Sequence, residues 1–397
     1  MKILFTTHAL SIGGIEVLAL RLSEAFADAG HQITLYDFNP DRRSAPFVAQ
    51  YDTTRFQLAG FTPGPVADWL TWKTNAVLFK TGWWRNTLRD TLTKRHFARF
   101  LATHEFDVIC SLSFHEDYLA CQYAAAKQTP VVVSMHGTYE HAAPEWPQRA
   151  RAIYESVRAI IYLADKNMAW YRAQPYFNPN MPLHKIYTGT DLGKPVPATL
   201  NRVDVGLSTE AFVFILVARG VAEKGWQQAI EALLSLRGRY PEAALLLVGE
   251  GEFIAEMRLR YAHEPGIIFY GKHPNPLELV RLAQVGLLPT YFPLESLPVS
   301  VMEYLRCALP VVATDIGEIA DMLRLSPAQT AGTVLALPPD GGPVAVSSLA
   351  QAMEQYLADP AFYQTKVGLA ERASLKFDIR ECVAKYTQVF TEVLSLP

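Results

Sequence analysis

The chain has 397 residues, half of them hydrophobic, which is enough to form two domains with separate cores. A formal net charge of −3 at pH 7 argues against a nucleic-acid-binding protein. No apolar run approaches the length of a membrane span, and residues 1–5 read directly into a strand, so we predict neither a membrane-spanning helix nor a signal peptide. The four cysteines lack the spacing of metal ligands or redox pairs, which predicts reduced core thiols in a cytosolic protein.

The chain opens with a predicted strand, a glycine turn, a helix and a second strand. Residues 1–5 form the first strand, apolar residues at helical spacing follow over 17–26, and residues 33–36 form the second strand. Gly13 and Gly14 lie at the turn, where the lack of side chains lets a ligand approach the backbone beside a helix N-terminus. The turn is not the G-x-G-x-x-G fingerprint, so a nicotinamide-binding site loses its main support.

A second unit of the same kind begins in the middle of the chain. Residues 212–218 are a fully apolar strand, and a helix and the strand 245–249 follow. Arg219 and Lys224 lie on the loop after the first of these strands, the end at which open α/β sheets bind ligands. Both cations suit phosphate oxygens, although an exposed, solvated loop is the alternative interpretation.

Two carboxylates follow a third predicted strand, which covers residues 285–289. Glu295 and Glu303 are eight residues apart, and helical apolar spacing begins at about Ser296, which we predict as the N-cap, with Pro298 in the first turn. Glu295 would then lie at the mouth of the helix. Glu303 would lie inside the helix and need hydrogen-bond donors, such as the two hydroxyls of a vicinal diol. The alternative is that both glutamates are ordinary surface residues.

In this order, these motifs resemble the retaining glycosyltransferases of family 4, which have the GT-B fold. The resemblance rests on the sequence GGIE at residues 13–16, the loop 219–225, and the E-x7-E segment with the strand 310–315 that follows it. Residues 131–136 are similar to the strand that carries the active-site histidine of the family. The implied fold class is α/β, with two Rossmann-like domains facing across a cleft.

The resemblance also implies a domain organisation. Residues 1–195 would form an N-terminal acceptor-binding domain, and residues 200–379 a C-terminal domain that binds the nucleotide-sugar. Residues 380–397 form a predicted amphipathic helix that would cross back to pack on the first domain. We expect the boundary within 191–209, where glycine, proline and polar residues interrupt the apolar pattern.

Site residues follow from the resemblance, position by position. The donor would be bound by Gly13, Gly14, Arg219, Lys224, Glu295, Ser296, Leu297 and Glu303. The acceptor would be bound by Gly14, Glu16 and His136. The catalytic residues would be His136, Arg219, Lys224 and Glu295.

The resemblance gives each of these residues a role. Glu303 would accept hydrogen bonds from the ribose, Glu295 would contact the donor sugar, and the two cations would stabilise the leaving diphosphate. His136 would lie beside the donor sugar, although a core histidine at a strand end is the alternative. No D-x-D pair occurs in the sequence, so we predict no metal site.

The sequence departs from the family pattern at several small residues. Ala218 precedes the arginine where glycine is common, Ala308 replaces the usual glycine before the 310–315 strand, and Thr188 replaces asparagine in an N-G-V-D turn. The charged residues are unchanged, so these departures affect the expected shape of the sugar pocket rather than its chemistry.

The implied activity is retaining, metal-independent transfer of a hexose-type sugar from a UDP- or GDP-linked donor, which is a substrate and not a cofactor. The acceptor would be a glycan or a lipid-linked molecule in cell-surface polysaccharide or lipopolysaccharide assembly, at the cytoplasmic face of the cell membrane. Two alternatives remain open: a nucleotide-sugar 2-epimerase, and a non-catalytic module that binds a nucleotide-sugar.

Residues 66–100 lie outside the shared motifs and are rich in tryptophan and basic residues. Four of the seven tryptophans are here, namely Trp69, Trp72, Trp83 and Trp84, together with seven lysines and arginines. Aromatic rings flanked by cations suit a helix lying in the interface of an anionic membrane. An ordinary pair of helices with buried tryptophans explains the same pattern.

Overall fold

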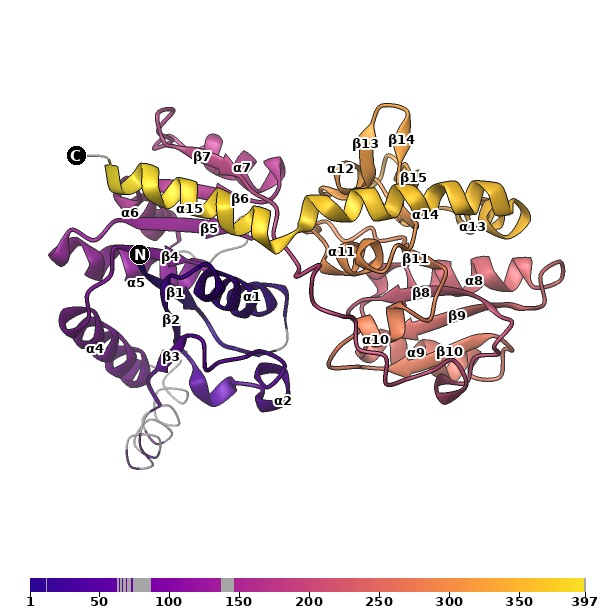
Figure 1. The fold of residues 1–397 in the computed structure, drawn as a ribbon, viewed down its shortest axis with the longest axis horizontal. Coiled ribbons are helices and arrows are strands. Elements are labelled where there is room, and N and C mark those ends of the chain that lie inside the picture. The colour runs from indigo at the N-terminus through magenta and orange to yellow at the C-terminus, as the bar shows by residue number, and fades with distance from the viewer. Residues whose placement is uncertain are drawn as a thin grey trace. The chain divides into compact units, whose positions relative to one another are not determined.

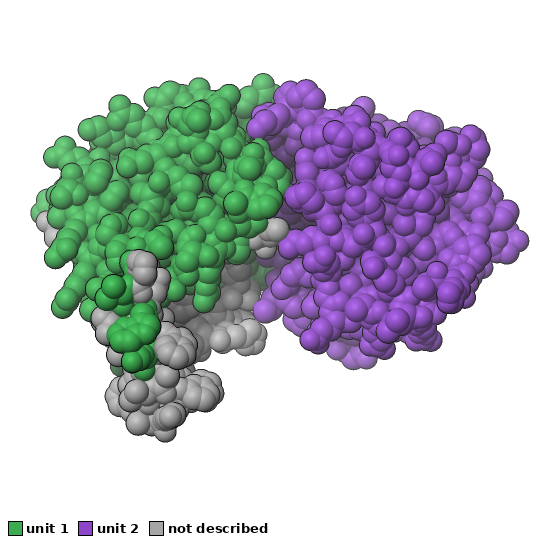
Figure 2. All heavy atoms as spheres, turned by 90° about the horizontal axis from the view of Figure 1, so that it is seen from below, with its two compact units in different colours: residues 1–188, 379–397 green, residues 189–378 purple. Residues whose placement is uncertain are grey.

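The structure is a computed structural model that describes residues 1–11, 13–62, 64, 66, 69, 73, 87–136 and 146–395. The chain forms two compact units, coloured separately in Figure 2. The first comprises Met1–Thr188 and Ile379–Pro397, and the second comprises Gly189–Asp378.

The first unit is built on a parallel sheet of seven strands in the order β3-β2-β1-β4-β5-β6-β7 (Figure 1). Its strands are β1 Lys2–Thr7, β2 Gln32–Asp37, β3 Gln57–Gly60, β4 Val108–Ser111, β5 Val131–Met135, β6 Ala159–Tyr162 and β7 Leu183–Lys185. Its helices are α1 Gly14–Asp28, α2 Ala45–Val48, α4 Thr87–Thr103, α5 Phe114–Ala124, α6 Trp146–Ser156, α7 Asp165–Arg172 and α15 Ile379–Ser395.

Helices cover both faces of this sheet, so its central strands are apolar on both sides. In β1, Ile3 and Phe5 belong to one core cluster and Leu4 belongs to the other. The last helix, α15, contributes Tyr386 and Phe390 to the first of these clusters, where α1 also packs. The first unit is therefore completed by the final segment of the chain.

The second unit repeats this design with six parallel strands in the order β10-β9-β8-β11-β12-β15. The strands are β8 Phe212–Val217, β9 Ala243–Val248, β10 Ile267–Gly271, β11 Val285–Leu288, β12 Val311–Thr314 and β15 Gly332–Leu335, with a short pair β13 Arg324–Ser326 and β14 Gln329–Thr330. The helices are α8 Trp226–Leu236, α9 Glu252–Tyr261, α10 Leu277–Val280, α11 Val299–Arg306, α12 Ile319–Leu323, α13 Val346–Ala358 and α14 Pro360–Ser374.

Each sheet has a topological switch point, where neighbouring strands send the chain in opposite directions. In the first unit the switch lies between β1 and β4, and in the second it lies between β8 and β11. Loops that leave the carboxyl ends of such a strand pair diverge and open a crevice, which is where open α/β sheets bind ligands. The fold therefore singles out the loops after these four strands.

The division between the units lies a few residues before the boundary that we expected within 191–209. The backbone N–H of Thr190 donates to the carbonyl of Phe377 over 2.7 Å, and Thr190 forms an isolated bridge with Asp378. The guanidinium of Arg306 donates to the Thr190 hydroxyl over 3.0 Å. These bonds hold the start of the linker on the second unit, although its sequence resembles a turn that ends the first domain.

The prediction that Ser296 caps a helix was wrong. Helix α11 begins at Val299, and its N-cap is Pro298, whose backbone is extended with ψ 123°. Glu295 therefore does not lie at the mouth of the helix but in a loop that precedes it by several residues. The residue before a proline is disfavoured in the helical conformation, which explains why the helix does not begin at Ser296.

None of the helices in the part of the chain that the structure describes has the length and apolar composition of a membrane span.

Candidate active site

The loop after β8 is fixed at both ends by close packing. The indole of fully buried Trp226 donates to the carbonyl of Arg219 over 2.9 Å, and the N–H of Gly220 donates to the carbonyl of Glu250 over 2.8 Å. Gly225 has φ +76°, and a Cβ there would lie 2.3 Å from the carbonyl oxygen of Pro289. Only glycine fits this position, so the loop that carries Arg219 and Lys224 is held against the end of β11.

The loop after β11 is fixed in a similar way from the other side. The N–H of Glu318 donates to the carbonyl of Ser296 over 2.9 Å, and Gly317 has φ +64°. A Cβ on Gly317 would lie 2.5 Å from that same carbonyl oxygen. Ser296 and Leu297 are buried in this loop, as is Glu295.

Lys224 and Glu295 form a buried ion pair at the switch point of the second unit. The ammonium donates to Oε2 of Glu295, and each side chain is only 9% exposed. The hydroxyl of Thr290 lies 3.1 Å from the same carboxylate oxygen. Removing one member of a buried pair leaves an uncompensated charge, so these residues depend on each other for stability.

Phe292 brings the second cation to the same place. Its ring centroid lies 4.9 Å from Nζ of Lys224 and 5.0 Å from the guanidinium carbon of Arg219. Attraction between a cation and an aromatic ring favours this geometry for both side chains. Two cationic groups therefore lie over one ring, with Arg219 exposed and the ammonium of Lys224 paired with Glu295.

Glu303 lies inside α11 and is buried, as its helical position predicts. Its neighbour Tyr304 is also buried, accepts from the N–H of Val217 over 2.7 Å, and donates to the carbonyl of Leu287 over 3.2 Å. Helix α11 is therefore tied to β8 and β11, so that Glu303 is carried on a rigid element beside the switch point.

In the first unit, the predicted glycine turn forms the start of α1. Gly13 is the N-cap, with extended backbone, and Gly14 is the first helical residue. The carboxylate of Glu16, in the first turn, folds over Gly13, because a Cβ there would lie 2.3 Å from Oε2. Burial raises the pKa of Glu16, so this carboxyl binds a proton more readily than a free glutamate does.

A second ion pair lies at the switch point of the first unit. His8 follows β1, Glu116 lies in the first turn of α5, and Nδ1 of His8 is 2.9 Å from Oε1 of Glu116. The hydroxyl of Ser113 donates to the same carboxylate over 2.6 Å. The hydrogen bond to Glu116 raises the pKa of His8 despite partial burial.

His136 follows β5 and is bonded to buried hydroxyls. Its Nε2 lies 2.9 Å from Oγ of Ser134, and that oxygen lies 2.7 Å from the hydroxyl of Tyr386 in α15. Burial lowers the pKa of His136 to about 3, so the imidazole is neutral at physiological pH. Segments 252 residues apart in sequence thus meet at this histidine.

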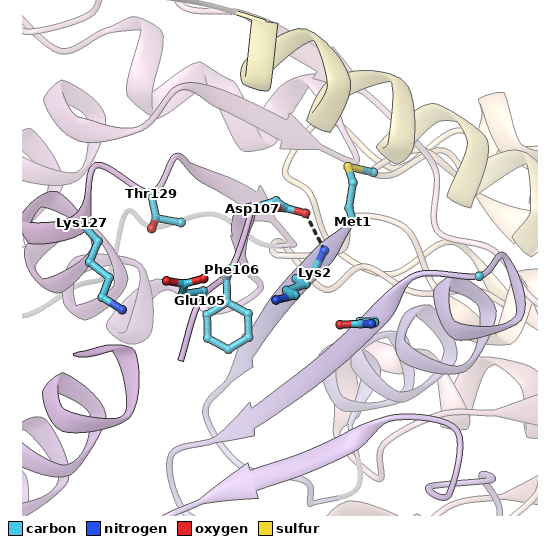
Figure 3. Close-up of a pocket in the computed structure, with 9 residues that line it drawn as sticks. Met1, Lys2, Glu105, Phe106, Asp107, Lys127 and Thr129 are labelled. Atoms are coloured by element: carbon cyan, nitrogen blue, oxygen red, sulfur yellow. Dashed lines mark hydrogen bonds between the residues drawn. The ribbon is translucent and has the colours of Figure 1, made fainter. Parts of the chain in front are cut away.

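Open hollows in the described part of the first unit also lie at the other end of the sheet. Figure 3 shows one of about 680 Å³, lined by Lys2, Phe106, Lys127 and neighbouring residues. These residues precede β1, β4 and β5 or begin them, so the hollow lies at the amino ends of the strands. Because ligands of open α/β sheets bind at the carboxyl ends, we do not assign it to the active site.

The predicted residues divide between the two units, and the structure brings only some of them into contact. Arg219, Lys224 and Glu295 are brought together, and Gly13 lies against Glu16. Sequence reasoning missed five residues that contact them or complete the switch points, namely Phe292, His8, Glu116, Ser134 and Tyr386. No motif marks them, but His8 and Glu116 could have been found, because each closely follows a strand at the switch point. The described residues contain no cluster of acidic, histidine or cysteine side chains able to hold a metal ion.

Two family comparisons cover most of the chain. The family described as Glycosyltransferase Family 4 matches residues 12–194, and the family described as Glycosyl transferases group 1 matches residues 211–359. The first match covers most of the first unit, and the second match lies within the second unit. The chain belongs to the family 4 glycosyltransferases of the GT-B type.

Solved structures show the same fold over the whole family 4 chain. The Anabaena protein HepE, in complex with UDP and glucose, superposes with a TM-score of 0.75 at 17% identity, covering 99% of this chain and 100% of that one. WaaG, a glycosyltransferase involved in lipopolysaccharide biosynthesis, has a TM-score of 0.64 at 16% identity, covering 98% and 99%.

Curated relatives of this family 4 chain match over shorter stretches. A 2-deoxystreptamine glucosyltransferase of Streptomyces kanamyceticus is 30% identical over 182 residues, 43% of each chain. The N-acetyl-alpha-D-glucosaminyl L-malate synthase of Bacillus anthracis is 23% identical over 323 residues, 79% of each chain. The match spans 26% of an uncharacterized glycosyltransferase of Methanocaldococcus jannaschii and 51% of a putative teichuronic acid biosynthesis glycosyltransferase of Bacillus subtilis.

Proposed function

We propose that the chain is a retaining, metal-independent glycosyltransferase that moves a hexose-type sugar from a UDP- or GDP-linked donor to a glycan or lipid-linked acceptor. The donor binds the second unit and the acceptor binds the first. The reaction serves cell-surface polysaccharide or lipopolysaccharide assembly at the cytoplasmic face of the membrane.

One observation carries the proposal: Arg219, Lys224 and Glu295 meet at the switch point of the second unit. A diphosphate needs two cations, and a donor sugar needs a hydrogen-bond acceptor beside them. Bound UDP and glucose in the structural neighbour HepE support a nucleotide-sugar as the ligand class.

Each residue has a defined task in this proposal. Arg219 and Lys224 bind the diphosphate and stabilise the negative charge that develops on it as the sugar leaves. Glu295 orients the sugar once Lys224 turns from the carboxylate to the phosphate. Glu303 accepts hydrogen bonds from the ribose, while His136 and Glu16, in the first unit, bind the acceptor.

Arg219→Ala tests the proposal most sharply, because Arg219 is exposed and its loss creates no buried unpaired charge. Turnover with the best UDP- or GDP-sugar, found by thermal-shift screening, should fall at least tenfold, roughly 1.4 kcal/mol of transition-state stabilisation. Arg258→Ala is the matched control, since that guanidinium lies 5.9 Å from the ring of Phe269 in the same unit. Equal activity of the two variants would refute the assignment.

The same assays separate the proposal from its alternatives. An epimerase would convert the nucleotide-sugar without an acceptor, and a non-catalytic module would bind it without turnover. Product analysis by proton NMR should show the anomeric configuration of the donor, in the presence of EDTA as well as in its absence. An inverted product, or complete loss of activity with EDTA, would contradict the retaining, metal-independent mechanism.

The proposal includes membrane contact through residues 66–100. Trp72, Trp83 and Trp84 lie outside the described residues, so the support comes from the part that the structure describes. Val66 and Trp69 are 72% and 52% exposed, and Nζ of Lys73 lies 4.1 Å from the ring centroid of Trp69. An exposed tryptophan with a cation beside it suits an anionic lipid surface.

A further inference from the structure

Three side chains form a hydrogen-bonded line from α15 to His136 in the first unit. The hydroxyl oxygens of Tyr386 and Ser134 are 2.7 Å apart, and Oγ of Ser134 is 2.9 Å from Nε2 of His136. Tyr386 and Ser134 are both 0% exposed, so neither hydroxyl reaches bulk water. The hydroxyl protons of Tyr386 and Ser134 must therefore be donated to acceptors within the protein.

Counting protons gives the direction of each hydrogen bond. The tyrosine hydroxyl has one proton to donate, and an unbonded donor in a protein interior is costly. Among the described contacts of Tyr386, Oγ of Ser134 is the acceptor for that proton. Ser134 thus accepts from Tyr386, and its own hydroxyl proton points to Nε2 of His136.

This direction determines which nitrogen of the imidazole is protonated. Nε2 accepts a hydrogen bond and cannot carry a proton, and a neutral imidazole carries its single proton on the other nitrogen. Burial keeps the ring neutral, because it lowers the pKa of His136 to about 3. The proton therefore lies on Nδ1.

We propose that Tyr386 is a positioning residue that, through Ser134, fixes His136 as the Nδ1–H tautomer. The ring then offers a hydrogen-bond donor, which suits a sugar hydroxyl or phosphate oxygen and disfavours a group that can only donate. The value of that donor in transfer rests on the proposed function, whereas the tautomer is a property of the first unit alone.

Tyr386→Phe is the decisive variant, because it removes only the hydroxyl and keeps the ring beside Phe26 and Phe390. Nitrogen-15 NMR of histidine-labelled full-length protein at pH 7 distinguishes the two tautomers, with His136→Gln assigning the signals. The wild type should carry the proton on Nδ1. In Tyr386→Phe an Nε2–H population should appear, since Ser134 can then accept from the ring.

A buried tyrosine elsewhere supplies the matched control. The hydroxyl of Tyr356 in α13 lies 3.0 Å from that of Thr333, so Tyr356→Phe makes the same chemical change in the second unit. It should leave the His136 signals unchanged. An Nε2–H tautomer in the wild type, or an unchanged Nδ1–H tautomer in folded Tyr386→Phe, would overturn the inference.

A double-mutant cycle provides a second test that does not depend on NMR. Ser134→Ala leaves the hydroxyl of Tyr386 buried without an acceptor, and adding Tyr386→Phe removes that hydroxyl. The double variant should therefore lose less stability than the sum of the single variants. Strict additivity would contradict the hydrogen-bonded line.

Transfer assays separate this inference from the proposed function. Tyr386→Phe should lower kcat about tenfold and leave the donor KM within about twofold, as expected for a contact that acts in the transition state. If the wild type transfers no sugar but the tautomer shifts, the proposed function fails and the tautomer assignment stands. If transfer occurs and the tautomer shifts without any change in kcat, the positioning role is overturned.

Discussion

Lys224 and Glu295 neutralise each other's charge, which allows both side chains to be buried. The sequence marked both residues through their resemblance to family motifs, but it did not show that they pair. Residues 71 positions apart meet because β8 and β11 are neighbours in the sheet, which no local pattern reports. At this scale, the identity of the charged groups was predictable and their partners were not.

The pair should show strong coupling in stability. Lys224→Met or Glu295→Gln alone should lower the unfolding free energy by about 3–5 kcal/mol, because an unpaired buried charge or donor remains. The double variant should lose less than the sum of the two, as measured by chemical denaturation. The exposed pair of Arg151 and Glu155 is the control, with an expected coupling below about 1 kcal/mol. Similar coupling in both cycles would contradict the burial argument.

The two histidines should give opposite pH dependences of stability. His136 has a folded pKa of about 3, below that of an unfolded histidine, so its neutral burial costs stability as pH falls below about 6.5, on the order of 2 kcal/mol at pH 5. His8 has a raised folded pKa, so its contribution is complete below pH 6.5 and is lost as pH rises through the folded pKa.

Variants at these histidines separate the two effects. His136→Gln should flatten the loss of stability between pH 8 and pH 5, and His8→Gln should reduce stability more at pH 5 than at pH 8. Unfolding free energies measured at both pH values provide the check. Parallel curves for both variants and the wild type would show that neither histidine titrates as described.

Helix α11 shows what sequence patterns reveal about an element and what they miss. Its apolar spacing correctly predicted a helix, but its start was placed at Ser296 because serine is a common N-cap. Its end is a Schellman motif, in which the N–H groups of Ala308 and Leu309 donate to the carbonyls of Leu305 and Tyr304, each over 2.9 Å. The motif requires a left-handed residue, and Ala308 adopts this conformation with φ +57°.

Ala308→Gly should stabilise the second unit by about 1 kcal/mol, because glycine adopts the left-handed conformation without the steric cost that alanine incurs. Ala255→Gly is the matched control, since Ala255 is exposed inside α9 and the same change should destabilise by about 1 kcal/mol. Thermal melting of both variants provides the measurement. A loss of stability in Ala308→Gly would show that the strain is absent.

The segment around Trp69 is the element whose function remains a proposal. If this surface contacts lipid, Trp69→Ser should reduce sedimentation with anionic vesicles, because the substitution removes an exposed aromatic ring that would insert into the membrane interface. Its melting temperature should not change. Leu259→Ser is the control, since Leu259 is 85% exposed in the second unit and should not alter sedimentation. A wild type that never sediments with anionic vesicles would refute the membrane contact.

At the scale of the whole molecule, the alternation of strands and helices was predictable because buried parallel strands are short and uniformly apolar. The order of the strands was not, since it depends on which strands pair across long separations. The amphipathic pattern of residues 380–397 indicated a helix, but only the folded chain shows that Tyr386 and Phe390 fill the core against Phe26.

Phe390→Ala should therefore destabilise the first unit selectively. Truncating a fully buried phenylalanine costs about 3–5 kcal/mol, and Phe390 is 0% exposed with its ring 5.8 Å from that of Phe26. Hydrogen exchange should increase throughout the sheet of the first unit and remain unchanged in the second. Leu394→Ala on the same helix, at a residue that is 42% exposed, should change neither. Equal effects of the two variants would contradict the packing of α15.

The position of α15 after the second unit has a consequence for synthesis on the ribosome. The first 188 residues emerge before the second unit, yet the core they form is completed only by Ile379–Ser395. The apolar surface that α15 covers stays open while residues 189–378 are translated and fold. Nascent chains thus carry an incomplete first unit until α15 has left the ribosome, and their exposed apolar surface is prone to aggregation for that whole interval.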